Sequence, residues 1–203
     1  MLNCVHADEH LLVFDKPSGL LSVPGRGPER QDCLSARAQT LWPDALIVHR
    51  LDMATSGLLL MARGAAMQRL LSEAFAKRRV GKRYVAVVQG QLAADSGSID
   101  APLILDWPNR PRQIVDSVHG KASLTHWQVL ARAGAQTRLA LEPVTGRSHQ
   151  LRVHLASIGH PILGDELYGD AGSAPRLLLH ACTLVFVHPA GGQLLQLRSE
   201  PPF

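Results

Sequence analysis

The hydrophobic residues of this chain fall into short runs separated by polar turns, a pattern typical of β-strands. The runs lie at 10–15, 45–49, 57–62, 83–89, 123–130, 137–142, 177–187 and 194–197. The run at 137–142 alternates cleanly, because Leu139 and Leu141 share one face while Arg138 and Glu142 share the other. We therefore expect a protein rich in β-strands.

Three other segments show helical spacing. Apolar residues three or four positions apart predict an amphipathic helix over 65–78, and a further helix over 147–158 is closed by Gly159. Asp32 is placed to cap a shorter helix that runs to Leu41. Because these helices do not alternate regularly with the strands, the sequence predicts an α+β fold with a mixed or antiparallel sheet rather than a doubly wound fold.

The composition is that of one globular domain. The 203 residues are 46% hydrophobic, and 21 Lys and Arg against 17 Asp and Glu give a net charge of +4, which favours a polyanionic partner. The three cysteines have no CxxC spacing, which disfavours a disulfide framework or a zinc site. Acidic residues interrupt the N-terminal region where a signal peptide needs an apolar run, and no apolar stretch reaches the ~20 residues of a membrane span. We therefore expect a cytoplasmic protein.

A short polar turn between two apolar runs is the first candidate for chemistry. Residues 49–57 read HRLDMATSG, so the ends of two strands hold Arg50 and Asp52 beside the core. Loops fixed by rigid strands commonly carry catalytic groups. A purely structural interpretation stays open, in which Asp52 forms an Asx-turn with nearby backbone amides.

Arg147 breaks local rules at the start of the predicted helix 147–158. It stands four residues before Leu151, on the helix face that Leu155 continues and that we expect to be buried. A cation there faces the positive end of the helix dipole, and an unpaired charge aimed at the core is costly. Such violations tend to mark functional sites, so we infer a buried carboxylate partner, for which Asp52 is the best candidate. The pairing would keep Asp52 ionised, as a carboxylate nucleophile requires.

A basic segment, 77–83, carries five cations where the helix predicted over 65–78 ends. The cations suit a solvated helix C-terminus, and they equally suit a patch that contacts phosphates through Arg79 and Lys82. Tyr84 follows at the start of the next strand, where an aromatic side chain is usually part of the core.

Nothing in the sequence indicates a metal or a nucleotide cofactor. His149 and His154 are five residues apart, which places them on different faces of a helix. The chain has neither a Walker-type loop nor a GxGxxG segment. We therefore expect no cofactor and no metal.

Several segments together resemble the RluA family of pseudouridine synthases. They keep the family's order and spacing over nearly the whole chain: HRLDMATSGLLLMA (49–62), KRYVAVVQG (82–90), GRSHQLRVHLASIGHPILGDELYG (146–169) and RLLLHA (176–181). Two more segments, PSGLLSVPGR (17–26) and DWPNRP (106–111), narrow the resemblance to a dual-specificity member. That member modifies a large-subunit (23S) rRNA loop and the anticodon stem-loop of tRNA.

The resemblance implies one catalytic domain over 1–203 with no S4 RNA-binding domain. It also implies a mixed, largely antiparallel sheet with a central cleft, and conversion of a specific uridine in RNA to its C-glycoside isomer. By motif, Asp52 matches the nucleophilic aspartate, and Arg50 matches the arginine that helps to displace the target base from the stack. Tyr84 matches a tyrosine that packs on the uracil and is a candidate base. Arg147 matches the basic partner of the aspartate.

Charge and loop position add expected contacts to the RNA backbone in the Arg-rich segments of the chain. The residues we expect to make them are Arg26, Arg79, Lys82, Arg110 and Arg112. We expect a monomer that binds rRNA and tRNA stem-loops and no membrane.

Three alternatives remain open. The chain could be a synthase that acts on only rRNA or only tRNA, a non-catalytic RNA-binding module, or a hydrolase in which Asp52 attacks a sugar or a phosphate. The conjunction of Asp52, Tyr84 and Arg147 disfavours a pure binder, which would not need it. The absence of a second catalytic carboxylate or a metal set from the sequence disfavours the hydrolase.

Overall fold

The computed structural model describes residues 2–203, and contacts between Cα atoms divide the chain into two compact units. Unit 1 comprises the residues up to Lys82 together with 181–202, and unit 2 comprises 83–180 with Phe203. Strands β5 (Gly81–Gln89) and β11 (Leu179–Val187) carry the chain from one unit into the other.

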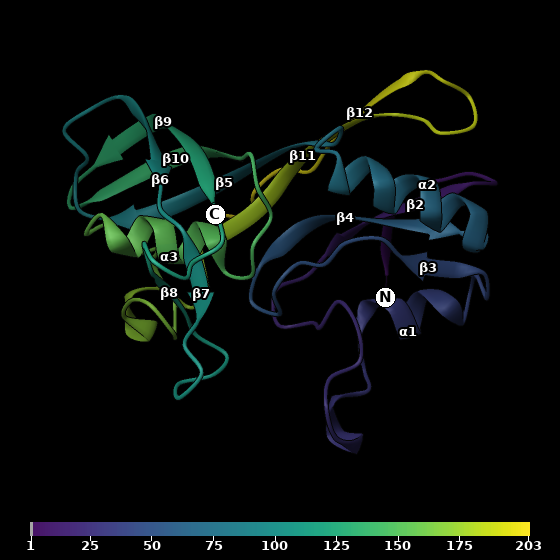
Figure 1. The fold of residues 1–203 in the computed structure, drawn as a ribbon, viewed down its shortest axis with the longest axis horizontal. Helices are drawn as coiled ribbons and strands as arrows, with labels where there is room; N and C mark the ends of the chain where they lie inside the picture. Colours follow the sequence, from purple (N-terminus) through teal and green to yellow (C-terminus); the bar gives the residue numbers. More distant parts are fainter. Residues whose placement is uncertain (1) are drawn as a thin grey trace. The chain divides into compact units, whose positions relative to one another are not determined.

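Unit 1 is a sheet with helices on its faces (Figure 1). Its strands stand in the order β1–β2–β4–β11, with β3 paired to β4 and β12 paired to β11. The pairings β1/β2, β2/β4, β3/β4 and β11/β12 are antiparallel. Besides β11, the elements are β1 (Asn3–Ala7), β2 (Leu11–Lys16), η1 (Pro28–Arg30), α1 (Leu34–Gln39), β3 (Ala45–Ile47), β4 (Ser56–Arg63), α2 (Gly64–Ala76) and β12 (Leu194–Arg198).

The core of unit 1 is built around β4, which is buried on both faces. Leu58 and Leu60 point to the face covered by α2, where they pack with Leu71. Leu59 and Met61 alternate with these residues along the strand, so they point to the opposite face, and both are fully buried. Each buried Leu or Met contributes about 1.5–3 kcal/mol to stability, so the strand that follows the Asp52 turn is held firmly in place.

Unit 2 is a second antiparallel arrangement, with strands in the order β5–β10–β9–β6. A separate two-stranded sheet, β7–β8, packs against α3. Besides β5, its elements are β6 (Ser96–Asp100), β7 (Leu103–Leu105), β8 (Gln113–Val115), β9 (Leu124–Ala133), β10 (Gln136–Pro143), α3 (Gln150–Ser157) and η2 (Ala171–Ser173). The predicted α+β class with largely antiparallel strands is confirmed.

Two details of the predicted helices are wrong. Asp32 does not cap α1; Cys33 does, because its Sγ accepts a hydrogen bond from Ala36 N at 3.4 Å, while Asp32 forms an exposed ion pair with Arg37 at 2.6 Å. The helix predicted to begin at Arg147 begins instead at Gln150. Within residues 2–203, no helix has the length and apolar character needed to cross a membrane.

Candidate functional site

The Asp52 turn, defined here as residues 50–55, links β3 to β4 in unit 1. Thr55 N donates a hydrogen bond to the main-chain oxygen of Asp52 at 3.1 Å, which closes the turn. Asp52 is partly buried and Arg50 is exposed. The chain then enters β4 through Gly57 at φ +109°, where a Cβ would lie 2.3 Å from the oxygen of Ala181. Only glycine fits at this position.

A second segment of unit 1 holds the Asp52 turn by its backbone. We call residues 16–22, KPSGLLS, the clamp segment. Ser22 Oγ donates to Leu51 O at 2.6 Å and accepts from Leu51 N at 3.1 Å, and both residues are buried. Ser18 Oγ donates to Ala54 O at 2.7 Å. The residues on both sides of Asp52 are therefore fixed by serine hydroxyls.

Lys16 completes the clamp from inside the core. Its side chain is fully buried, and its ammonium donates to the main-chain oxygens of Met53, Leu20 and Pro17 at 3.1, 2.8 and 2.9 Å. Gly19 N donates to Met53 O at 2.9 Å. A buried cation is costly unless several acceptors surround it. Here those acceptors belong to the clamp segment and to the Asp52 turn, so Lys16 joins the two.

His49, just before the turn, is held as a neutral structural residue. Its Nε2 accepts a hydrogen bond from Leu60 N at 2.9 Å, and its ring stacks on Phe75 with centroids 4.4 Å apart. Burial, followed by the nearby charge of Lys82, lowers the pKa of His49 to about 3. At neutral pH the proton therefore sits on Nδ1, and the ring serves packing rather than proton transfer.

The basic segment 77–83 is less uniformly accessible than its sequence indicates. Lys77 pairs with Glu73 on the last turn of α2, and Arg79 is exposed. Lys82 is half-buried, and burial, followed by the charge of Arg78, lowers the pKa of its ammonium. Arg79 therefore suits a phosphate contact better than Lys82 does.

Tyr84 and Arg147 belong to unit 2. Tyr84 is partly buried on β5, in register with Leu141 of β10. Arg147 lies before α3 and is exposed, which corrects the expectation that it points into the core from the first turn of a helix. Its main-chain N donates to Gln150 Oε1 at 3.0 Å, and its Nε donates to Ala122 O at 3.4 Å. The ion pair between Asp52 and Arg147 stays a prediction.

The buried cation of this region is Arg152, one turn further along. Its Nε and Nη2 donate to the two carboxylate oxygens of Asp165 at 2.8 and 2.6 Å, and the two side chains are 5% and 0% exposed. Burial raises the pKa of Asp165, but the hydrogen bonds and charge of Arg152, with two backbone amides, outweigh it and lower the pKa. Asp165 thereby fixes the segment that carries Tyr168, whose hydroxyl bonds to His149 Nδ1 at 2.7 Å. This network orders the turn that presents Arg147.

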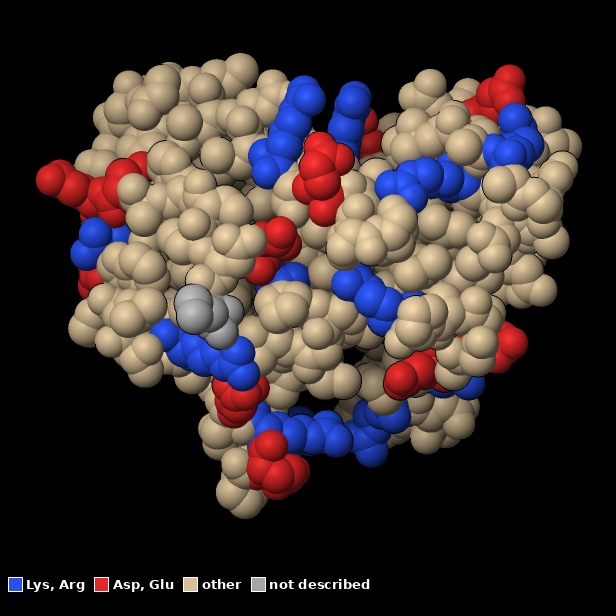
Figure 2. All heavy atoms as spheres, turned by 180° about the vertical axis from the view of Figure 1, so that it is seen from behind, with Lys and Arg blue, Asp and Glu red and all other residues tan. Residues whose placement is uncertain are grey.

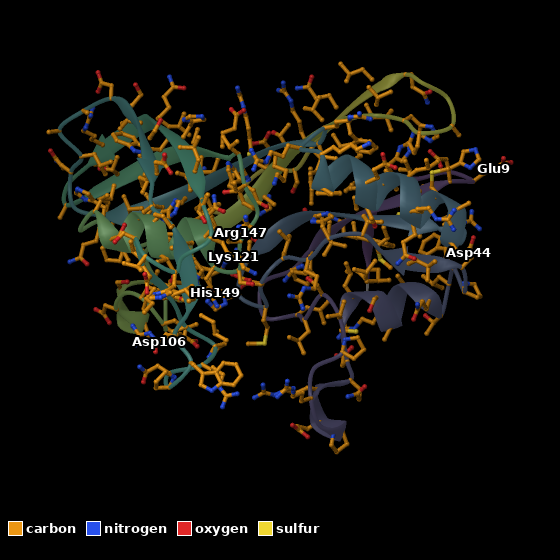
Figure 3. The ribbon with its side chains drawn as sticks, viewed as in Figure 1. Glu9, Asp44, Asp106, Lys121, Arg147 and His149 are labelled. Atoms are coloured by element: carbon orange, nitrogen blue, oxygen red, sulfur yellow. The ribbon has the colours of Figure 1, made fainter. Side chains whose placement is uncertain are left out.

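The remaining predicted RNA contacts lie on exposed loops. Arg26 lies in the loop after β2, and Arg110 and Arg112 lie in the loop that joins β7 to β8. Lys121 is an exposed cation that sequence reasoning missed; it lies one residue from Ala122, the residue that Arg147 contacts (Figure 3). On the face shown in Figure 2, Lys and Arg are interspersed with Asp and Glu rather than forming a continuous patch. Charge alone therefore does not mark a nucleic-acid-binding surface on this face.

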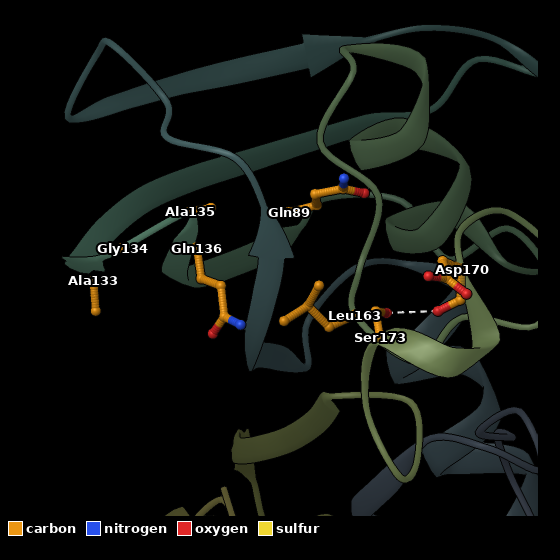
Figure 4. Close-up of a pocket in the computed structure, with 8 residues that line it drawn as sticks. All are labelled: Gln89, Ala133, Gly134, Ala135, Gln136, Leu163, Asp170 and Ser173. Carbon is orange, nitrogen blue, oxygen red and sulfur yellow. Dashed lines mark hydrogen bonds between the residues drawn. The ribbon is translucent and has the colours of Figure 1, made fainter.

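A cavity of about 430 Å³ in unit 2 contains none of the predicted site residues (Figure 4). It is lined by Gln89, Ala133, Gly134, Ala135, Gln136, Leu163, Asp170 and Ser173. Its one carboxylate, Asp170, accepts a hydrogen bond from Gly172 N at 2.8 Å and caps η2. The hydroxyl of Ser173 donates to the main-chain oxygen of Asp170 at 2.5 Å, so both of these side chains bond to the local backbone.

His154 of α3 has a structural role. His154 is buried and bonds to Thr125 Oγ1 and Ala101 O, both at 2.9 Å. Burial lowers the pKa of His154. Among residues 2–203, no group of three or more His, Cys, Asp or Glu side chains could hold a metal ion.

Comparison with known proteins identifies relatives over almost the full chain. A family model described as RNA pseudouridylate synthase matches residues 10–157. A protein of Yersinia pestis named dual-specificity RNA pseudouridine synthase RluA is 49% identical over 203 residues, which cover 98% of this chain and 98% of that protein. The Escherichia coli (strain K12) protein of the same name is 47% identical, over 98% of this chain and 93% of that protein.

Solved structures with the same fold include two human proteins. Human RNA pseudouridylate synthase domain containing 1 superposes with a TM-score of 0.83 at 27% identity, over 100% of this chain and 84% of that chain. Human RNA pseudouridylate synthase domain containing 4 superposes with a TM-score of 0.78 at 28% identity, over 98% of this chain and 88% of that chain. The names of the sequence relatives and of the structural neighbours therefore point to the same family.

Proposed function

This chain belongs to the RNA pseudouridylate synthase family, and on that premise we propose that it isomerises specific uridines to pseudouridine in two kinds of RNA. The substrates proposed are a loop of the large-subunit rRNA and the anticodon stem-loop of tRNA. The observation that carries the proposal is the near-full-length identity to proteins named dual-specificity RNA pseudouridine synthase. The clamped Asp52 turn supports it, because it holds the matched nucleophile rigidly beside the core.

The reaction breaks the bond between C1′ of the ribose and N1 of the uracil, rotates the base, and joins C5 to C1′. C5 then loses its proton and N1 gains one, so the product is an isomer of the substrate. We propose that the carboxylate of Asp52 drives the first step, as a nucleophile or as a stabiliser of positive charge at the sugar. Because the detached base must not escape, positioning supplies much of the rate. A turn fixed through its own backbone meets that requirement, because hydrogen bonds restrain the residues on both sides of Asp52.

The roles proposed for three further residues follow the family motif. Arg50 would displace the target base from the stack, which its exposure allows. Tyr84 would pack on the uracil, and Arg147 would hold Asp52 ionised. We further propose that residues 1–203 are a single catalytic domain and that the protein acts as a monomer in the cytoplasm. It would need neither a cofactor nor a metal. The cysteines, which lack disulfide or zinc spacing, support a reducing compartment.

The experiment incubates the protein with unmodified tRNA and with a large-subunit rRNA fragment, in the presence of EDTA, and maps pseudouridines by carbodiimide chemistry. We expect one modified uridine region in each RNA. Modification of a single RNA class would establish the single-specificity alternative, and modification of neither would overturn the proposal.

The role of Asp52 is tested with a matched pair of substitutions. Asp52→Asn removes the carboxylate and should abolish isomerisation while leaving RNA affinity within about twofold of wild type, because the two side chains are isosteric. Asp44→Asn is the control: Asp44 is exposed and pairs with Arg63 at 3.1 Å, a type of contact worth about 0–1 kcal/mol. Pseudouridine formation by the Asp52→Asn variant would remove Asp52 from the mechanism.

A further inference from the structure

The loop between β7 and β8 displays an aromatic ring stacked with a cation. Trp107 is 65% exposed, although tryptophan is usually well buried. The guanidinium of Arg110 lies 4.2 Å from the centre of its ring, within the range of a cation–π contact. Since one guanidinium covers only one face of an indole, this exposure leaves ring surface for a second planar partner.

The loop is preorganised by its own hydrogen bonds. Asn109 N donates to Asp106 O at 3.1 Å, Arg112 N donates to Asn109 O at 3.1 Å, and Asp106 N donates to Arg112 O at 2.9 Å. The side chain of Asn109 also donates to the Asp106 carboxylate at 2.9 Å. Figure 3 marks Asp106 at the start of this loop. A partner that docks on Trp107 therefore has little loop entropy to overcome.

The base of the same hairpin is anchored to the buried network described above. Gln113 N donates to the hydroxyl of Tyr168 at 2.7 Å, and the guanidinium of Arg112 lies 5.5 Å from the Tyr168 ring. Tyr168 in turn is positioned by the backbone hydrogen bond to Asp165. The exposed tip is thus carried on a fixed stem rather than on a free loop.

The surroundings of Trp107 fit nucleic acid. Arg110 stacks on the ring, Arg112 is exposed in the same loop, and the carboxylate of Asp106 already accepts a hydrogen bond from Asn109. An exposed aromatic ring among cations is the arrangement that proteins use to stack unpaired bases, because the ring supplies stacking and the cations neutralise phosphates. We propose that Trp107, backed by Arg110, is a stacking platform for an unpaired base of the substrate stem-loop. That base is distinct from the target uridine, whose proposed packing partner is Tyr84, and the inference rests on the proposed function.

The test compares four variants on the RNA substrates of the wild-type protein. Trp107→Ala should weaken RNA binding and lower kcat/KM by about 5- to 150-fold, the loss typical of one base stack. Trp107→Phe retains an aromatic face and should recover most of the loss. Leu194→Ala is the control, because Leu194 is 67% exposed on β12, and it should behave as wild type. Arg112→Ala tests the predicted phosphate contact.

Salt dependence separates stacking from charge. Arg112→Ala should reduce the slope of log affinity against log salt by about 0.7–0.9, the value for one lost phosphate contact. Trp107→Ala should leave that slope unchanged. If its defect instead disappears at high salt, or if its affinity and kcat/KM equal those of wild type, the stacking platform is refuted.

Abasic substrates identify the stacked base. In a series of RNAs that each lack one base at an unpaired position, the base that stacks on Trp107 is the one whose removal makes Trp107→Ala and wild type equivalent. If Trp107→Ala binds more weakly than wild type by the same factor on every abasic RNA, no single base stacks on Trp107. That result would overturn the inference while leaving the proposed function intact. Absence of pseudouridine with the wild-type protein would instead overturn the proposed function, and this inference with it.

Discussion

Replacement of Ser22 by alanine should loosen the Asp52 turn without touching Asp52 itself. The hydroxyl of Ser22 makes two hydrogen bonds to Leu51, one to its oxygen at 2.6 Å and one from its N at 3.1 Å. Ser22 is 3% exposed and Leu51 is 7% exposed, so water does not readily replace the hydroxyl. The substitution therefore leaves a buried donor and a buried acceptor without partners, next to Asp52, the proposed nucleophile.

The size of the effect follows from these two groups. Each orphaned buried polar group costs about 1–3 kcal/mol, so Ser22→Ala should lower the free energy of unfolding by about 2–6 kcal/mol. For a chain of this length, each kcal/mol shifts Tm by about 2–4 °C, which predicts a decrease of about 4–24 °C. Relaxation of the turn to regain partners would move Asp52, and a misplacement of about 1 Å lowers turnover on the order of 100-fold.

Thermal unfolding and single-turnover pseudouridine formation at 25 °C measure the two effects separately. Ser35→Ala is the matched control, because Ser35 is a buried serine on α1 whose hydroxyl contacts only the weak hydrogen-bonding sulfur of Cys33, at 3.3 Å. We expect a smaller loss of stability in this control and wild-type turnover. A Ser22→Ala protein with lowered Tm but wild-type turnover would refute the reasoning that the clamp positions Asp52.

Two further predictions concern stability. Burial raises the pKa of Asp8, but hydrogen bonds from a backbone amide, from the His6 ring and from a second amide outweigh it and lower the pKa to about 2. Because the pKa of an aspartate in the unfolded chain is about 4, the stability that Asp8 contributes is complete above about pH 4 and is lost as the pH falls towards 2. In urea unfolding at a series of pH values, the free energy of unfolding of Asp8→Asn should therefore change less than that of wild type between pH 4 and pH 2. Asp165→Asn should cost about 3–5 kcal/mol because it removes the carboxylate charge to which the buried Arg152 guanidinium is hydrogen-bonded, whereas the double variant Arg152→Met/Asp165→Leu should recover much of the loss in denaturant unfolding. Strictly additive losses would show that the two side chains do not act as a pair.

The strands were predictable because their patterns reflect burial directly. The run at 57–62 became β4 almost residue for residue, since an uninterrupted apolar stretch has few alternatives to a strand buried on both faces. Short strands such as β7 and β8 escaped prediction, because three residues carry too little periodicity and their pairing depends on the tertiary context. The turn that carries Trp107 was therefore identified as basic but not as a hairpin.

The long-range contacts of the clamp segment could not be predicted from the pattern of residues along the chain. Lys16 ends an apolar strand and stands before KPSG turn chemistry, so the sequence indicates only the end of a strand. Its function arises because residues 37 positions apart meet, and the oxygen of Met53 accepts from its ammonium. A charged residue at the end of an apolar run was the available sign, and only the fold reveals that acceptors surround it.

The sequence predicted a buried ion pair near the start of this helix, and the structure has one at Arg152 rather than at Arg147. The sequence indicated that a cation near the start of this helix needs a buried carboxylate partner. That reasoning depends on where the helix begins, and a shift of three residues moves Arg147 out of the helix and into solvent. The carboxylate was found with Arg152, whose partner Asp165 lies in the same unit. The assignment of Arg147 to Asp52 therefore no longer has the support of burial and rests on the family motif alone.

Arg147→Met tests that motif independently: loss of turnover with unchanged Tm is the expected result, because an exposed side chain contributes little to stability. Wild-type turnover in this variant would remove Arg147 from the mechanism.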